Sequence, residues 1–94
     1  MTGKIKGRRW NVGDVAYKKQ QTYDEAPPFG EDYEFELVIT RETIDQAPGR
    51  DAEYYYFYKV LNITNNAPEH PLITGISAGN DLRKNPHFGK KFWK

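Results

Sequence analysis

Two short segments, one near each end of the chain, mix cations with aromatic rings. They read Lys4-Ile5-Lys6-Gly7-Arg8-Arg9-Trp10 and Lys90-Lys91-Phe92-Trp93-Lys94. Cations neutralise phosphates while rings stack on bases, and Arg and Trp are also favoured contact residues between proteins. The partner-binding residues predicted from these segments are Arg8, Arg9, Trp10, Lys90, Lys91 and Trp93. In the alternative interpretation, the rings plug an open end of the fold and the lysines keep the chain ends soluble.

Charged residues are sorted along the chain. Residues 1–19 hold six basic residues against one acid (+5), residues 20–69 hold three basic residues against eleven acids (−8), and residues 70–94 hold five basic residues against one acid (+4). The net charge of +1 conceals this segregation. Because patches of opposite sign steer encounter and fix orientation, the pattern predicts a partner-binding protein. It also allows self-association of the basic ends with the acidic middle.

Residue types that build catalytic or metal sites occur here without the partners they need. His70 and His87 stand beside prolines, and the chain has no cysteine to complete a metal site, so both are predicted to be solvated. The acids of residues 24–36 lack the spacing of an EF-hand. Glu34 and Glu36 alternate outward, which predicts a solvated acidic face. Without a nucleotide-binding glycine motif or a nucleophile-elbow serine, we predict no enzyme, no cofactor and no metal.

A membrane-spanning or secretory segment is also missing from the sequence. There is no run of about 18 apolar residues, the length that a transmembrane helix needs. No apolar region follows the N-terminal cations, as it would in a signal peptide. We therefore predict a soluble, cytoplasmic protein without a membrane partner.

Strands are the elements that must position these residues. In residues 33–40 the apolar side chains alternate with Glu34, Glu36 and Thr40, the period of a strand with one wet face. Residues 54–61 are rich in β-favouring aromatics. The core residues predicted from the two strands are Tyr33, Phe35, Leu37, Ile39, Tyr54, Tyr56, Tyr58 and Val60.

Lys59 assigns the faces of the second strand, because a lysine is rarely buried without a partner. Tyr55, Phe57 and Leu61 then share the Lys59 side. Either another segment covers these side chains or they form an exposed apolar stripe. Tyr55 and Phe57 are therefore further candidate partner-binding residues.

Shorter strands are predicted at residues 14–18, 72–76 and 87–93, and a single 3₁₀ or α turn in residues 77–84. The string Trp10-Asn11-Val12-Gly13-Asp14-Val15-Ala16-Tyr17 resembles the opening of SH3-like barrels, a family that includes Tudor and KOW-type domains. There a glycine lets the chain bend into the first strand. The resemblance implies an all-β, five-stranded bent barrel over residues 1–94, with basic segments 1–10 and 89–94 whose order is left open. Because the first and last strands of SH3-like barrels lie close together, it also implies that the two basic chain ends merge into one patch. An OB-like barrel is the alternative.

Taken together, these patterns favour a small, non-catalytic interaction module that binds a protein partner or an assembly. A short, cysteine-free chain of this kind resembles many phage-encoded accessory proteins, which implies a viral protein. The alternative function is nucleic-acid binding through the basic and aromatic chain ends. Against it, the isoelectric point of about 7.9 lies below the value of about 9 that is typical of basic nucleic-acid-binding domains.

Overall fold

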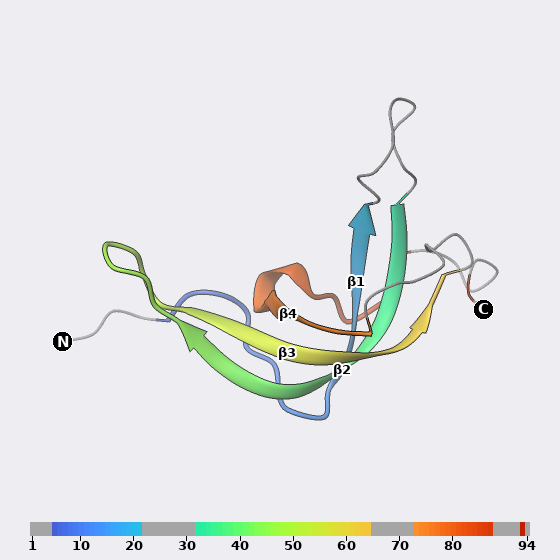
Figure 1. Cartoon of the computed structure of the whole chain (residues 1–94), viewed down its shortest axis with the longest axis horizontal. Helices are drawn as coiled ribbons and strands as arrows, with labels where there is room; N and C mark the ends of the chain where they lie inside the picture. Colours follow the sequence, from blue (N-terminus) through green and yellow to red (C-terminus); the bar gives the residue numbers. More distant parts are fainter. Residues whose placement is uncertain (1–4, 22–31, 65–72, 88–92, 94) are drawn as a thin grey trace.

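Four antiparallel strands and one 3₁₀ turn form the fold in the computed structural model, which describes residues 5–21, 32–64, 73–87 and 93. The elements are β1 (Val15–Gln21), β2 (Asp32–Asp45), β3 (Glu53–Ile63), β4 (Thr74–Ala78) and η1 (Gly79–Asp81). Each strand pairs with the next along the chain, in the order β1-β2-β3-β4 (Figure 1). The predicted all-β class and the single short turn before the C-terminal segment are confirmed.

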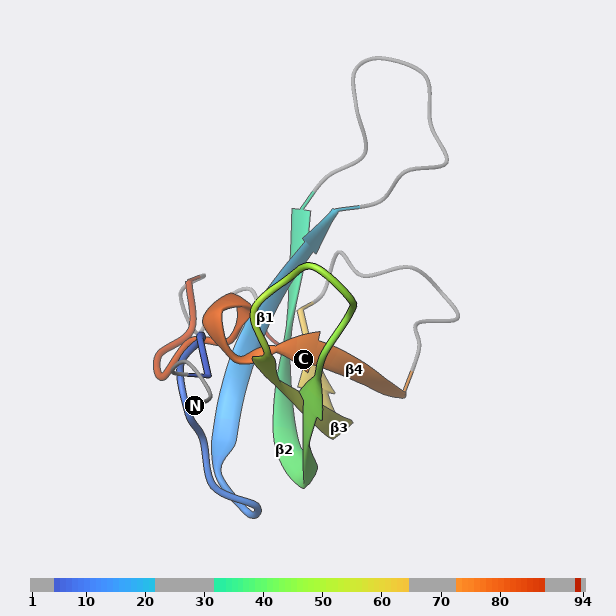
Figure 2. The same cartoon turned by 90° about the vertical axis from the view of Figure 1, so that its left-hand side faces the viewer.

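Two register shifts bend the sheet. They lie in the pairing of β2 with β3, between Glu36 and Leu37 and between Ile39 and Arg41. An extra residue in one strand of a pair bends that strand and increases its twist. As a result β2 curves, and β1 runs across the direction of the far half of β3 (Figure 1). Seen from the side, the strands wrap around a common interior (Figure 2).

The interior of this bent sheet is filled largely by the residues that alternation predicted. Leu37, Ile39 and Tyr56 are at most 1% exposed, and Phe35 and Tyr58 are also buried. Tyr33, Tyr54, Val60 and Ile63 are partly buried and pack against this cluster. Trp10, from before β1, and Leu82, from after η1, complete the core.

Gly13 makes the turn into β1. Its φ of +94° lies in the left-handed region, where a side chain is strained and glycine is not. The Gly13 N–H donates to the Ile39 carbonyl at 2.8 Å, which fixes the turn against β2. The prediction that a glycine bends the chain into the first strand is therefore confirmed.

The sheet does not close into the predicted five-stranded barrel. Beyond η1, the described residues hold only isolated bridges, from Arg83 to Tyr17 in β1 and from Trp93 to Thr64. The Arg83 bridge consists of two hydrogen bonds, of 2.8 and 2.9 Å, between the backbones of Tyr17 and Arg83. The segment after η1 thus touches the free edge of β1 without extending along it. Most of the predicted strand at residues 87–93 lies outside the described residues.

The prediction of a solvated acidic face is wrong at Glu34. Its side chain alternates outward as expected, yet the residue is completely buried. Both carboxylate oxygens accept the backbone N–H of His87, at 2.9 and 2.7 Å. Neighbouring Glu36 accepts the Tyr17 hydroxyl at 2.8 Å, and the Trp93 ring stands edge-on to that of Tyr17. The prediction was wrong because alternation assigns a side chain to a face but cannot say what later covers that face.

Leu37 tests the assignment of the core. Leu37→Ala should lower the free energy of unfolding by about 2–5 kcal/mol, since the buried side chain leaves a cavity when it is truncated. Urea denaturation followed by tryptophan fluorescence measures the change. Leu61→Ala, at a residue 51% exposed, is the matched control and should change stability by less than about 1 kcal/mol. Equal losses in the two variants would contradict the core assignment.

Candidate functional site

The segment Arg8–Trp10 is anchored to the core by its backbone and by the Trp10 ring. Trp10 is 5% exposed, and its Nε1–H donates to the Gly79 carbonyl at 2.9 Å. The Trp10 backbone N–H donates to the Tyr56 hydroxyl at 2.8 Å. The Arg8 backbone N–H donates to Asn80 Oδ1 at 2.9 Å. The Trp10 ring is thus part of the core, and residues 8–10 of the basic N-terminal segment are ordered.

Two arginine side chains project from this anchored segment. The Arg8 guanidinium lies 4.5 Å from the centre of the Trp10 ring, a cation–π distance. The Arg9 guanidinium lies 5.4 Å from the Tyr54 ring, and its Nε is 3.4 Å from Glu42 Oε2. Hydrogen bonding to Glu42 and its charge raise the pKa of Arg9. The Arg9 side chain is still 67% exposed, so its charge remains accessible.

Tyr56 links the core to these cations. Its hydroxyl accepts the Trp10 N–H and donates to Glu42 Oε2 at 2.9 Å, the same oxygen that Arg9 approaches. Burial raises the pKa of Tyr56; the hydrogen bond from the Trp10 N–H partly opposes this shift, and the hydrogen bond to Glu42 adds to it. The phenol therefore stays neutral at ordinary pH and can donate and accept at once.

A groove of about 640 Å³ opens beside the two arginines. We call it the cationic groove; it is lined by Arg8, Arg9, Trp10, Asn11, Asp14, Val15, Lys84 and Asn85. Its lining holds three cations against one carboxylate. Asp14 Oδ2 accepts the Asn11 backbone N–H at 2.8 Å, so this carboxylate also holds the turn that leads into β1.

Lys84 and Asn85 were missed as site residues when the sequence was read alone. The backbone bonds between Arg83 and Tyr17 hold the segment after η1 against β1, and this places the next residues at the groove. The signal was present in Arg83-Lys84, a basic pair at the end of the segment (residues 77–84) in which the turn was predicted. What the sequence did not contain was the position of that turn relative to Arg8.

The predicted merging of the two basic chain ends is not observed in the described residues. Lys6 pairs with Glu53, the first residue of β3, whereas Trp93 pairs with Thr64, just after the last residue of β3. Trp93 thus lies at the opposite end of β3 from the N-terminal segment. The expectation assumed that residues 87–93 run beside β1, but the bridge to β1 comes from Arg83 instead. Lys90 and Lys91 lie outside the described residues.

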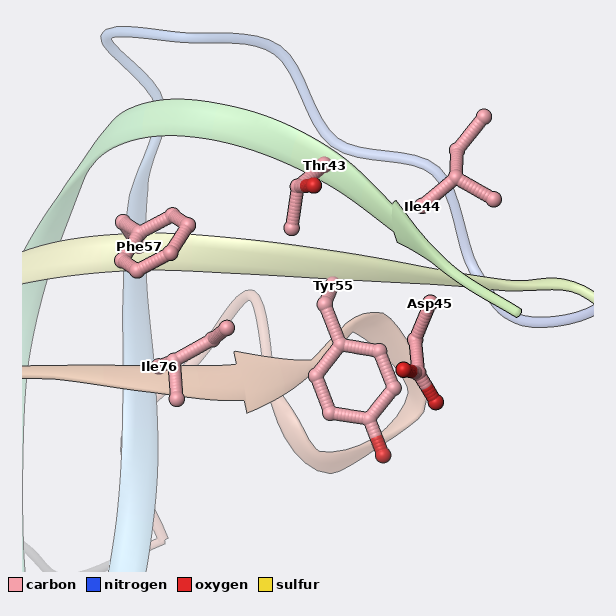
Figure 3. A pocket seen from close by; sticks show the side chains of 6 residues that line it. All are labelled: Thr43, Ile44, Asp45, Tyr55, Phe57 and Ile76. Carbon is pink, nitrogen blue, oxygen red and sulfur yellow. The ribbon is translucent and has the colours of Figure 1, made fainter. Parts of the chain in front are cut away.

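Tyr55 and Phe57 lie, as predicted, on the side of β3 that faces away from the core. With Leu61 of β3 and Ile76 of β4 they form what we call the outer apolar face. Leu61 is 51% and Ile76 47% exposed, so the exposed-stripe alternative is the correct one there. The Arg41 guanidinium lies 4.2 Å from the centre of the Phe57 ring. A hollow of about 440 Å³ on this face is lined by Tyr55, Phe57 and Ile76 together with residues 43–45 at the end of β2 (Figure 3).

Lys18 belongs to neither surface, although it was counted with the N-terminal cations. It pairs with Phe35 across β1 and β2, on the same face of β1 as buried Ala16. Burial lowers the pKa of Lys18, and the charge of Asp81 partly opposes that shift. Of the N-terminal cations, Arg8 and Arg9 are therefore the ones that line the cationic groove.

Across the described ranges, no group of three His, Cys, Asp or Glu residues is arranged to hold a metal ion. No helix in that part of the chain has the length and apolarity needed to cross a bilayer. No protein-family model, curated protein or solved structure matches the chain. Function is therefore inferred from the two surfaces themselves.

Tyr56→Phe tests whether the hydroxyl of Tyr56 holds the arginine segment in place. The variant leaves the Trp10 N–H and the Glu42 carboxylate without a buried partner, so unfolding free energy should fall by about 1–3 kcal/mol. Chemical denaturation measures the change in the free energy of unfolding. Tyr55→Phe removes a hydroxyl from the outer apolar face and is the matched control, with an expected change within about 0.5 kcal/mol. If both variants unfold like the parent, the hydroxyl is not an anchor.

Proposed function

We propose that this protein is a non-catalytic interaction module that binds a negatively charged segment of a protein partner in the cationic groove. The observation that carries the proposal is the anchoring of Arg8 and Arg9. The Arg8 backbone N–H donates to Asn80 Oδ1, and the adjoining Trp10 donates its backbone N–H to the Tyr56 hydroxyl and its Nε1–H to the Gly79 carbonyl. Both arginines therefore leave from a fixed segment, and mainly their side chains lose conformational freedom on binding. Preorganised cations retain more of the interaction energy than cations on a flexible tail.

The chemistry of the groove favours carboxylates over nucleic acid. Arginine presents a planar fork that matches a carboxylate or a phosphate in bidentate geometry. Stacking on bases, which unpaired nucleic acids use, needs an open ring, and the Trp10 ring is 5% exposed beneath Arg8. Asp14 in the groove and the acidic middle of the chain would repel a long polyphosphate. Nucleic-acid binding remains the alternative function, in which Arg8, Arg9 and Lys84 contact phosphates.

We further propose that the module is a relative of the SH3-like barrels. Four features support this: the Val12-Gly13-Asp14-Val15 opening with its bent glycine, the antiparallel order of the strands, the 3₁₀ turn after β4, and the return of Arg83 to β1. Small barrels of this kind serve as docking units, which agrees with an accessory role in a larger assembly of the type that phages encode.

The double variant Arg8→Glu/Arg9→Glu tests the groove. Binding of a fluorescent polyglutamate peptide, measured by anisotropy, should weaken by more than about tenfold, because each charge-assisted contact is worth about 1.5–3 kcal/mol. Added salt should weaken binding to the parent as well. The control Arg50→Glu/Lys59→Glu makes the same change in net charge at two exposed residues outside the groove and should bind nearly as the parent does.

A single-stranded oligonucleotide serves as the competing probe. If it displaces the peptide and binds with a steep salt dependence that the double variant loses, the alternative function is correct. If both double variants weaken peptide binding equally, only net charge matters and the cationic groove is not a site.

A further inference from the structure

The two edges of the sheet differ. The outer edge of β1 is contacted by Arg83, through two backbone hydrogen bonds with Tyr17. β4 forms the other edge, and it pairs only with residues Tyr55 to Lys59 of β3. In the part of the chain that the structure describes, no segment pairs with the far side of β4. An unpaired strand edge offers N–H and C=O groups to another strand.

The register shows which backbone groups of β4 face outward. The Val60 N–H donates to the Ile73 carbonyl at 2.8 Å, so residue 73 turns its backbone groups toward β3. Hydrogen-bonded and non-hydrogen-bonded pairs alternate along an antiparallel ladder. Gly75 and Ser77 therefore also face β3, whereas the N–H and C=O groups of Thr74 and Ile76 point to the open side.

Within the described residues, β4 carries no charged side chain, proline or bulge that would protect an exposed strand edge. From residue 73 to residue 80 the sequence reads Ile-Thr-Gly-Ile-Ser-Ala-Gly-Asn, without a charge or a proline. Each of the other three strands contains charged residues. Charged side chains, prolines and bulges normally keep edges apart, so β4 is permissive for pairing.

Apolar side chains continue to this edge. Ile76, which lies on the same face as Phe57 of the neighbouring strand, is 47% exposed. Two hollows, of about 440 and 480 Å³, flank Ile76, and both are lined by Phe57 and Ile76; Figure 3 shows the first of them. A strand added beside β4 would therefore gain apolar contacts on the outer face in addition to backbone hydrogen bonds.

We propose that the occupant of this edge is a second copy of the chain, whose β4 pairs antiparallel with the first about a two-fold axis close to Ile76. Such a contact is isologous, with the same patch on both subunits, and it joins the two outer apolar faces into one band. Because β4 carries no charge, it does not repel a second β4 strand. For the same reason it offers no charge that would favour a charged partner over a second copy.

Charges at the rim of the outer apolar face are complementary under this symmetry. Asp45 borders the face near Tyr55, and Lys59 borders it near Thr74. An antiparallel two-fold brings the Lys59 end of one copy toward the Asp45 end of the other, so the two lysines are kept apart, as are the two aspartates. Because β4 has only five residues, the interface is smaller than the roughly 1,200 Å² that stable complexes bury. The dimer should therefore be weak and concentration-dependent.

Sedimentation equilibrium of the full chain at rising concentration tests the proposal. The apparent mass of the parent should rise toward twice the chain mass, whereas Ile76→Lys should stay at the mass of one chain. Leu61→Lys is the matched control: it adds the same charge to the same face, at a residue of similar exposure beyond the part of β3 that β4 covers. It should associate as the parent does. A parent that remains a monomer at every concentration overturns the proposal.

Disulfide trapping gives a second readout that does not depend on the stability of a lysine variant. The chain has no cysteine, so a single introduced thiol reports on one contact. Ile76→Cys should oxidise to a covalent dimer at least about tenfold faster than Leu61→Cys, because Cα atoms that face each other across paired strands lie within disulfide reach. Equal rates contradict the proposed edge.

The double variant Arg8→Glu/Arg9→Glu separates this proposal from the function of the cationic groove. It should dimerise as the parent does. If it abolishes association while Ile76→Lys does not, the copies associate through basic and acidic surfaces, and the β4 pairing is wrong.

Discussion

The hydroxyl of Tyr56 is the point at which the core and the candidate site depend on each other. Its ring is fully buried in the bent sheet, while its oxygen accepts from the Trp10 backbone and donates to Glu42. A buried polar group costs free energy unless it is bonded, so the fold is most stable when Trp10 and Glu42 occupy these positions. The same requirement fixes where Arg8 and Arg9 leave the surface.

Bending of the sheet makes this arrangement possible. A flat meander of four strands would leave one face open to water, and Trp10 and Leu82 would have no common interior to enter. The register shifts in the pairing of β2 with β3 curve the sheet so that segments before β1 and after η1 reach the same core. Those two segments supply the cations of the groove. The groove therefore exists because both segments pack into the interior of the bent sheet beside each other.

Much of the fold could be predicted from the sequence, because alternation is a local property. Phe35 and Leu37 were assigned to the core from a period-two pattern alone. In the second strand Lys59 decided which alternating set faces outward, which placed Tyr56 in the core and Phe57 on the opposite face. Glu34 and Lys84 could not be placed in this way. The burial of Glu34 depends on the backbone of His87, 53 residues away. The place of Lys84 depends on where Arg83 meets Tyr17, and no local pattern encodes such a contact.

The distribution of charge keeps the two proposed binding surfaces of this small domain independent of each other. Charged residues make up 29% of the chain, yet residues 73–80 contain only Asn80 as a strongly polar side chain. At physiological ionic strength a surface charge acts over about 8 Å, so a groove that holds three cations influences mainly its own surroundings. A neutral edge neither attracts nor repels a partner at that distance. The proposed selection by charge in the groove and the proposed pairing by backbone at β4 are therefore separable in one chain, and different substitutions test them.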